Sequence, residues 1–210
     1  MKILITGGAG YIGSHTIVEL SEIPGFEIIS SDNFSNATPE TFQRIKKITG
    51  KGVKNYPDDL TDLNAAKNIF HENPDIKGII HFAALKAVGE SVEKPVFYYR
   101  NNLTSLLNLL DCSRQFNLNY FIFSSSCTVY GNINKLPVTE NTPLQNPESP
   151  YGFTKLAGER ILEDYCKVHP SFKAIILRYF NPVGAHPSGE IVELPLNKPN
   201  NLVPIITQTA

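Results

Sequence analysis

Short apolar runs alternate with longer amphipathic segments along most of the chain, and this alternation predicts its secondary structure. The apolar runs predict strands at residues 2–6, 27–31, 53–56, 78–82, 120–125 and 173–180. The amphipathic segments predict helices at residues 11–22, 39–49, 62–72, 95–116 and 151–168. Strand–helix units whose strands are apolar throughout are typical of a parallel sheet with helices on both faces. The pattern therefore predicts an α/β fold with a doubly wound parallel sheet, a Rossmann-type domain.

A glycine-rich turn, GGAGYIG at residues 7–13, directly follows the first predicted strand. Glycines let the backbone turn tightly and approach a pyrophosphate, and the N-terminus of the next helix offers N–H donors and positive potential. The spacing alone is a weak signal, because glycines also mark ordinary turns. Here a strand precedes the turn and a helix follows it, so we expect a dinucleotide site that includes Gly7, Gly10 and Gly13.

Other strand ends point to the same cleft, because ligands of this architecture lie beyond the carboxyl ends of the strands. Asp32 ends the second strand, where a carboxylate can bind the ribose hydroxyls and repel a 2′-phosphate, which favours NAD over NADP; a loop or cap acid is the alternative. Asp59 is expected to contact adenine, with a loop hydrogen bond as a nearly equal alternative. Ala83 and Ala84 leave room for the cofactor against the backbone. Asn101 lies within the long helix, where a solvated or buried structural amide is the competing interpretation.

Tyr151 and Lys155 are four residues apart, so they project from one face of the predicted helix. A free phenol has a pKa of about 10, and a nearby ammonium or the positive nicotinamide would favour its ionised form. Three serines, of which Ser126 is the last, end the fifth predicted strand and can direct a hydroxyl into the same cleft. A Tyr-x-x-x-Lys spacing is common by chance on surface helices. Its position after a serine-ended strand and a dinucleotide loop predicts hydride chemistry on a bound nicotinamide.

The charge, the hydrophobic runs and the cysteines argue against several classes of partner and site. The formal net charge is -1 and no basic cluster occurs, which argues against a nucleic-acid partner. No apolar stretch is long enough to cross a bilayer, and the N-terminal apolar run reaches glycines too soon for a signal peptide, so no membrane association is expected. Cys112, Cys127 and Cys166 are widely separated, which argues against a disulfide framework or a metal site. We expect free, largely buried thiols and a reducing, cytoplasmic location.

Three longer phrases carry a family resemblance: HFAALKAVGES at 81–91, FSSSCTVYG at 123–131 and LRYFNPVGAHPSG at 177–189. Together with the motifs above, they resemble the UDP-glucose 4-epimerases of the extended short-chain dehydrogenase/reductase family over nearly the whole chain. The resemblance implies that Tyr151 is the acid/base, that Lys155 binds the nicotinamide ribose and lowers the pKa of Tyr151, and that Ser126 binds the reacting sugar oxygen.

The resemblance also implies the lining of the two ligand sites. The residues expected to contact NAD are Tyr11, Ile12, Asp32, Asn33, Asn36, Asp59, Leu60, Phe82, Ala83, Lys86, Asn101 and Phe180, beside the glycines and the Tyr151–Lys155 pair. The residues expected to contact the UDP-sugar are Ser126, Thr128, Tyr151, Asn181, Asn201 and Leu202. For Lys86 and His186, a solvated charge and a plain loop residue are the alternatives.

The reaction implied by the resemblance inverts the sugar C4 of UDP-glucose or UDP-galactose through a 4-keto intermediate, with NAD kept tightly bound. A homodimer is implied for the full-length protein. Residues 204–210 resemble the start of a helix, so we expect an N-terminal fragment: an NAD-binding domain at 1–180 and the beginning of a substrate-binding region at 181–210. Two alternatives stay open, an NAD-binding module that is inactive as this fragment and a different nucleotide-sugar enzyme such as a dehydratase. The Ser126-Cys127-Thr128 run disfavours the dehydratase, because similar dehydratases place acidic residues there.

Overall fold

The computed structural model describes residues 1–134, 136–193 and 202–209. In this part of the chain six parallel strands form one sheet in the order β3-β2-β1-β4-β5-β6. The strands are β1 (Lys2–Thr6), β2 (Glu27–Ser31), β3 (Lys54–Tyr56), β4 (Ile76–His81), β5 (Tyr120–Ser126) and β6 (Lys173–Tyr179). The order reverses between β1 and β4, so the predicted doubly wound sheet is confirmed, and the strand bounds agree with prediction to within two residues.

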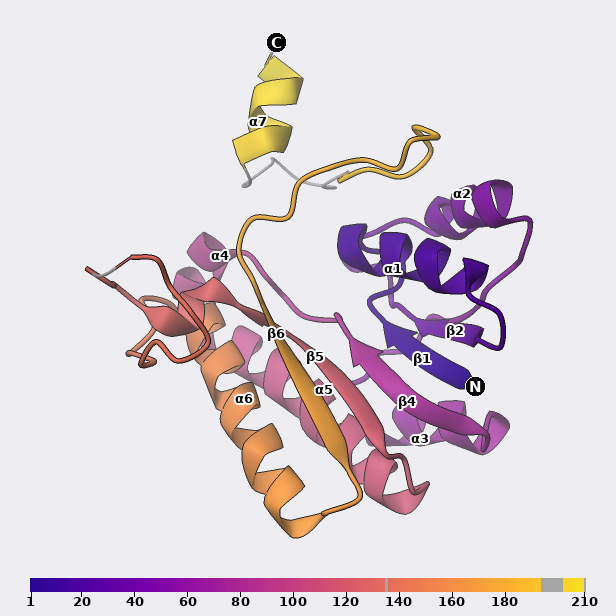
Figure 1. Cartoon of the computed structure of the whole chain (residues 1–210), viewed down its shortest axis with the longest axis horizontal. Coiled ribbons are helices and arrows are strands. Elements are labelled where there is room, and N and C mark those ends of the chain that lie inside the picture. Colours follow the sequence, from indigo (N-terminus) through magenta and orange to yellow (C-terminus); the bar gives the residue numbers. More distant parts are fainter. Residues whose placement is uncertain (135, 194–201, 210) are drawn as a thin grey trace.

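Helices cover both faces of the sheet (Figure 1). The long helices are α1 (Tyr11–Glu22), α2 (Glu40–Thr49), α3 (Leu63–Glu72), α5 (Pro95–Gln115) and α6 (Pro150–Val168). Residues of α3, α5 and α6 form one apolar core with Leu4 of β1, whereas α1 and α2 form a second core with Ile3 and Ile5 of the same strand. Successive side chains of a strand point to opposite faces, so an apolar run in β1 supplies both cores.

Two short helical elements were not predicted, α4 (Val88–Glu93) and the 3₁₀ helix η1 (Cys127–Tyr130). Both are too short to show a helical period in the sequence. Helix α7 (Leu202–Thr209) agrees with the expected helix start near Pro204. The three cysteines are free, but only Cys112 is buried, and the expectation that all three are largely buried is wrong for the half-buried Cys127 and Cys166.

The start of α6 is held in place by its own sequence. The Ser149 hydroxyl accepts a hydrogen bond from the Gly152 N–H at 3.1 Å, and Pro150 occupies the first helical turn. A serine cap and a proline with a helical φ both favour a helix that begins at this residue. Tyr151 is thereby placed in the first turn, immediately beyond the carboxyl end of β5.

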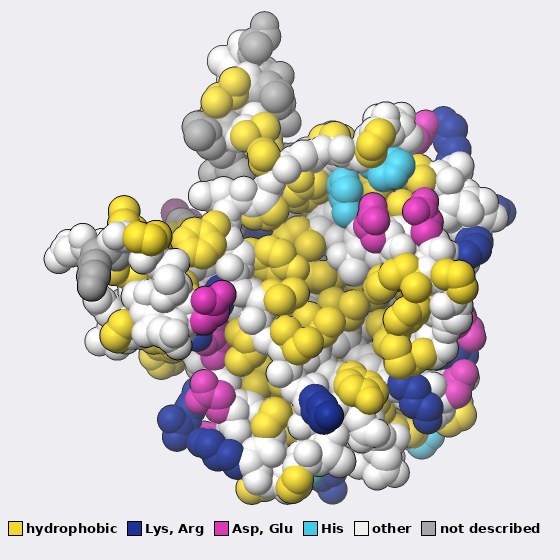
Figure 2. All heavy atoms as spheres, viewed as in Figure 1, with side chains coloured by type: hydrophobic (Ala, Val, Ile, Leu, Met, Phe, Trp, Pro, Cys, Tyr) yellow, Lys and Arg dark blue, Asp and Glu magenta, His cyan; other side chains and the backbone are white. Residues whose placement is uncertain are grey.

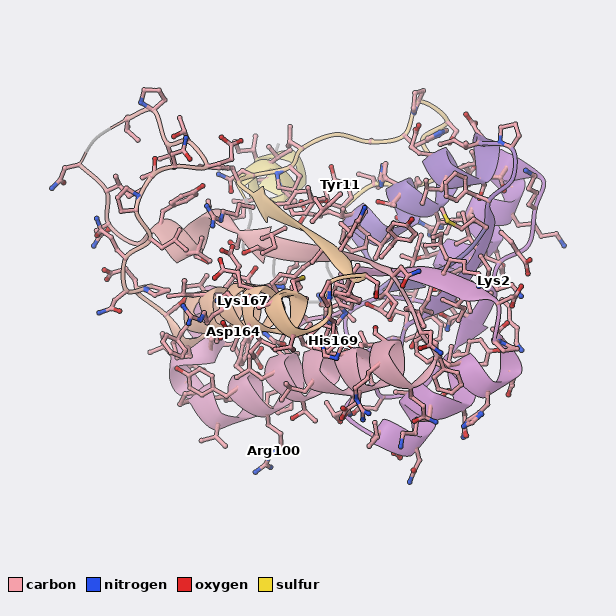
Figure 3. The ribbon with its side chains drawn as sticks, turned by 60° about the horizontal axis from the view of Figure 1, so that its bottom comes forward. Lys2, Tyr11, Arg100, Asp164, Lys167 and His169 are labelled. Atoms are coloured by element: carbon pink, nitrogen blue, oxygen red, sulfur yellow. The ribbon has the colours of Figure 1, made fainter. Side chains whose placement is uncertain are left out.

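The segment 181–193 crosses from the end of β6 back over α1 and α2 (Figure 1). Tyr11 lies beside it and its hydroxyl donates a hydrogen bond to the Gly184 carbonyl at 2.7 Å (Figure 3). Glu190 pairs with Lys47 of α2, and Ile191 is buried in the core formed by α1 and α2. The segment is therefore anchored at several points, while the domain boundary near Asn181 stays a prediction.

Among the described residues, no helix covers the β5–β6 half of the sheet face on which α1 and α2 pack. Hydrophobic side chains gather over the middle of the sheet in the space-filling view (Figure 2). Ile175 and Leu177 of β6 are exposed. In the described ranges, the helices are too short or too polar to span a bilayer.

A buried histidine makes the stability of this fold sensitive to acid. His81 ends β4, stacks on Phe123 and shares a 2.7 Å hydrogen bond with Thr6 Oγ1. Burial, with a smaller contribution from the Lys155 charge, lowers the pKa of His81 from 6.5 to about 3. Between these two values the unfolded chain takes up a proton that the folded chain does not, so the stability present above pH 6.5 is lost as the pH falls.

We therefore expect His81 to lower the free energy of unfolding by about 1.4 kcal/mol per pH unit between about pH 6.5 and 3. Urea unfolding at pH 7 and pH 5 measures this, and the H81Q variant should lose about 2 kcal/mol less than wild type over that interval. The H71Q variant is the control, because His71 is exposed. Equal pH slopes in wild type and H81Q would contradict the assignment.

Candidate active site

A large cleft of about 770 Å³ lies at the carboxyl ends of the strands, where the strand order reverses. This is the expected ligand position in an open parallel sheet. It brings together all the predicted site residues that the structure describes with their side chains. They are Gly7, Gly10, Tyr11, Ile12, Gly13, Asp32, Asn33, Asn36, Asp59, Leu60, Phe82, Ala83, Lys86, Asn101, Ser126, Thr128, Tyr151, Lys155, Phe180 and Asn181.

The glycine turn forms the floor of this cleft between β1 and α1. Gly7 has a left-handed φ of +70°, and a Cβ there would lie 2.7 Å from the Ala83 nitrogen. A Cβ on Gly13 would lie 2.2 Å from the Gly7 carbonyl oxygen, so α1 can start this close to the turn only because Gly13 lacks one. Gly10 precedes α1 and no side chain caps the helix there. The N–H groups of the first turn of α1 can therefore bind a diphosphate.

Asp32 lies beyond β2 and ties two loops of the cleft together. Its carboxylate accepts hydrogen bonds from the Ala9 N–H and the Phe34 N–H, each at 2.9 Å. Burial raises the pKa of Asp32, and these backbone donors partly offset the increase. The predicted alternative, a loop acid, is thus part of its role. Because the side chain also lines the cleft, its position suits ribose hydroxyls and disfavours a 2′-phosphate.

Tyr151 and Ser126 lie at the other end of the cleft, across β1 and β4 from Asp32. Burial raises the pKa of Tyr151, and a hydrogen bond with the Ser126 side chain lowers it in part. Ser126 also accepts a hydrogen bond from the Thr128 N–H at 3.3 Å. The Oγ1 atom of Thr128 is buried with no hydrogen-bond partner among the described residues, although the residue itself lines the cleft.

The predicted effect of Lys155 on Tyr151 is not seen. The Lys155 ammonium is buried, donates a 2.7 Å hydrogen bond to the Ser124 carbonyl and lies 5.9 Å from the centre of the Tyr151 ring. Burial lowers the pKa of Lys155 to about 8. Desolvation of the phenol is the largest effect on Tyr151, and an ammonium held by a backbone carbonyl at this distance does not offset it, so the pKa of Tyr151 rises instead.

Three other predicted contacts have local partners of their own. Asp59 is exposed and accepts a hydrogen bond from the Thr61 N–H at 2.9 Å, which is the loop role given as its alternative. Lys86, in the loop after β4, pairs with Glu193 of the 181–193 segment at 3.4 Å. Asn101 donates to the side chain of Asn102 at 2.9 Å. All three still line the cleft, and their roles toward a cofactor stay predictions.

Only some of the residues expected at the sugar-binding end of the cleft are among those that the structure describes. Phe180 is exposed beside Tyr130, with 6.4 Å between the ring centres, and Asn181 is exposed at the rim. The His186 ring makes a 2.7 Å hydrogen bond with Ser188 Oγ inside its own loop, in line with its plain loop alternative. Asn201 and the side chain of Leu202 lie outside the described residues.

Sequence reasoning missed a buried ion pair behind the serines. Glu159 of α6 is 1% exposed, accepts a hydrogen bond from Ser125 Oγ and binds Arg178 of β6 with N–O distances of 2.8 to 3.3 Å. Arg178 also donates to Tyr130 Oη at 3.0 Å. The pair joins β5, β6, η1 and α6 around the site. A usable signal existed, because Glu159 lies four residues after Lys155 and so shares its buried helix face.

A second missed residue is Asn102, which neighbours the predicted Asn101 and is more buried. Two successive asparagines are unfavourable in the middle of a helix, so their presence in α5 was a sign of a specific role.

Comparison with known proteins shows which family the chain resembles. A model of the "NAD dependent epimerase/dehydratase family" matches residues 3–199. The chain is 50% identical over 210 residues to the UDP-glucose 4-epimerase of Erwinia amylovora, covering 100% of this chain and 62% of that protein. It is 46% identical over 215 residues to the UDP-glucose 4-epimerase of Mus musculus, covering 100% of this chain and 61% of that protein.

Among solved structures, the fold matches UDP-glucose 4-epimerase from Bifidobacterium longum in complex with NAD+ and UDP. The TM-score is 0.95 at 48% sequence identity, covering 99% of this chain and 62% of that chain. The chain thus spans about three fifths of the length of the relatives that it matches.

Proposed function

Because the chain belongs to the NAD dependent epimerase/dehydratase family, we propose that the protein is a UDP-glucose 4-epimerase that interconverts UDP-glucose and UDP-galactose with tightly bound NAD. The observation that carries the proposal is the single cleft in which the glycine turn and Asp32 lie at one end and Ser126, Tyr151 and Lys155 at the other. The 50% identity to a UDP-glucose 4-epimerase along the whole chain supports the same function.

The residues present fit a dinucleotide. The turn at Gly7 and Gly13 leaves no space for side chains, the first turn of α1 can bind a diphosphate, and Asp32 suits the adenosine ribose. The small Ala83 and Ala84 line the cleft beyond β4. When bound, NAD supplies the acceptor and later the donor of the hydride at the sugar C4.

The side chains of this chain perform the proton transfer and the positioning. Tyr151 takes the proton from the sugar 4-hydroxyl and returns it when the carbon is reduced on its other face. Ser126, which is already hydrogen-bonded to Tyr151, orients the reacting oxygen. Lys155 binds the nicotinamide ribose, and Thr128, which lines the cleft next to Ser126, contacts the sugar. Desolvation raises the pKa of Tyr151, and a bound, positively charged nicotinamide would favour the ionised phenol that can accept this proton.

A homodimer is favoured by the exposed apolar residues Val92, Val96 and Phe97 of α4 and α5, which a second copy would bury. The substrate-binding region from residue 181 and the cytoplasmic location stay predictions from sequence. The alternative of an inactive NAD-binding module applies to residues 1–210 as a separate chain, because the matched relatives are longer.

A product assay tests the function on the protein in its full natural length. The purified protein is expected to convert UDP-galactose to UDP-glucose without added cofactor, and extraction of its bound dinucleotide should yield NAD and no NADP. Release of a dehydrated keto-sugar would overturn the epimerase in favour of a dehydratase, and bound NADP would contradict the role of Asp32.

A further inference from the structure

Among the described residues, three cationic side chains line the cleft, and one of them has no partner of its own. Lys86 is engaged by an ion pair, and Lys155 by a backbone carbonyl. The third, Arg44 of α2, is half-buried and forms no hydrogen bond or ion pair in the part of the chain that the structure describes. The carboxylate of Glu40, one turn earlier on the helix, attracts it from beyond ion-pair distance. The guanidinium of Arg44 is therefore available to a ligand in the cleft.

The packing of α2 places Arg44 on the side of the helix that borders the cleft. Helix α2 lies beside α1 (Figure 1), with Ile45 fully buried and Phe42 packed on the core that the two helices share. Phe42 also meets Phe34 edge to face, with 6.1 Å between the ring centres. Thr41 and Arg44 are three residues apart, and both line the cleft. The core contacts of the helix therefore fix the face on which Arg44 lies.

The loop between β2 and α2 is held in place by Asp32. Its carboxylate accepts a hydrogen bond from the Phe34 N–H at 2.9 Å, and Phe34 has a left-handed φ of +58°, which is uncommon outside glycine. Asn55 of β3 donates to the Asp32 carbonyl at 3.1 Å. Because α2 follows this short loop, Asp32 and Arg44 line the same end of the cleft.

The group that extends beyond Asp32 indicates what Arg44 would bind. With the adenosine ribose at Asp32, the groups that project from that sugar are the adenine base and, in NADP, a 2′-phosphate. A carboxylate disfavours the phosphate, which leaves the flat adenine ring as the ligand. A guanidinium is planar and always charged, and it stacks on aromatic faces, including those of nucleobases.

We propose that Arg44 binds the adenine of NAD by stacking its guanidinium on the ring. The inference rests on the proposed function, because it takes NAD to be the bound cofactor. A cation–π contact of this kind contributes a factor of about 3 to 30 in affinity, depending on how far it is desolvated. Loss of the contact should therefore appear as faster release of the bound NAD.

The test uses the full-length protein with its bound cofactor and follows the exchange of that NAD for radiolabelled NAD. R44A removes the guanidinium, whereas R44K keeps the positive charge and loses the planar face. K46A is the matched control, because Lys46 is an exposed cation of the same helix that does not line the cleft. The identity and amount of the bound dinucleotide are measured on the same samples.

We expect R44A and R44K to exchange NAD about 3- to 30-fold faster than wild type. K46A should exchange NAD at the wild-type rate, because its lost charge does not face the cofactor. R44K separates the two ways in which an arginine can act, since a lysine replaces its charge but not its flat surface.

The outcomes distinguish this inference from the proposed function. If wild type carries no dinucleotide, the proposed function fails. If wild type carries NAD and R44A exchanges it at the wild-type rate, the adenine contact is overturned. A wild-type rate in R44K overturns it as well, because charge alone would then suffice, and so does bound NADP, because the guanidinium would then face the 2′-phosphate. If R44A does not fold, R44K decides.

Discussion

Replacing Tyr151 with phenylalanine is expected to lower kcat of the full-length protein by about 10²- to 10⁴-fold, the usual contribution of a general acid–base group. The hydroxyl oxygen is the only heavy atom removed, and it is the atom that Ser126 contacts in the cleft. The phenyl ring stays in the first turn of α6, which is capped by Ser149 and Pro150 independently of the hydroxyl. NAD should therefore stay bound.

The assay follows the conversion of UDP-galactose to UDP-glucose, with the dinucleotide content measured on the same sample. Y120F is the control, because Tyr120 is exposed at the start of β5, at the opposite edge of the sheet from the cleft. A Y151F protein that retains more than about a tenth of the wild-type rate would exclude Tyr151 as the acid/base.

Replacing Gly13 with alanine is expected to have the second large effect, on cofactor binding and stability together. The new Cβ would lie 2.2 Å from the Gly7 carbonyl oxygen and 2.9 Å from the Gly8 Cα, both backbone atoms of the turn. Neither can rotate away as a side chain would, so the turn or the start of α1 must shift. Overpacking of this kind costs about 1–3 kcal/mol of folding free energy. A displaced turn should also weaken NAD binding by about tenfold or more.

Urea unfolding and NAD titration of the G13A variant measure these two effects. G89A is the matched control, since Gly89 is also helical and a Cβ there meets nothing within 4 Å. It should bind NAD as wild type does and be more stable by up to about 1 kcal/mol, as usual for glycine to alanine in a helix. Wild-type NAD affinity in G13A would show that the turn does not bind the diphosphate.

Several features of the site could be predicted because they depend on chain direction alone. In a parallel sheet all carboxyl ends meet at one edge, so residues that follow different strands must gather there. Gly7 after β1, Asp32 after β2, Ala83 after β4 and Ser126 at the end of β5 meet in one cleft for this reason. The buried strands could be predicted from their apolar runs, because a strand covered on both faces supplies side chains to two cores.

The hydrogen-bond partners of the polar side chains could not be predicted, because they depend on distances between elements that the pattern does not encode. The sequence pointed to Asn101, whereas the neighbouring Asn102 is the residue that binds Leu85 and Thr154. A shift of one residue turns a helical side chain by about 100°, and only the packing of α5 on α6 decides which amide faces inward.

By itself the sequence determined the order of strands and helices, the glycine turn and the placing of a phenol and an amine on one helix face. These are local properties, set by side-chain periodicity and by what the backbone allows at each residue. Only the tertiary structure decided the surroundings of those groups: it partly buries Tyr151, which raises its pKa, and it places the Lys155 ammonium in a hydrogen bond with the Ser124 carbonyl. A pKa depends on how much water and charge surround a group in three dimensions, and those surroundings come from elements far apart in the chain.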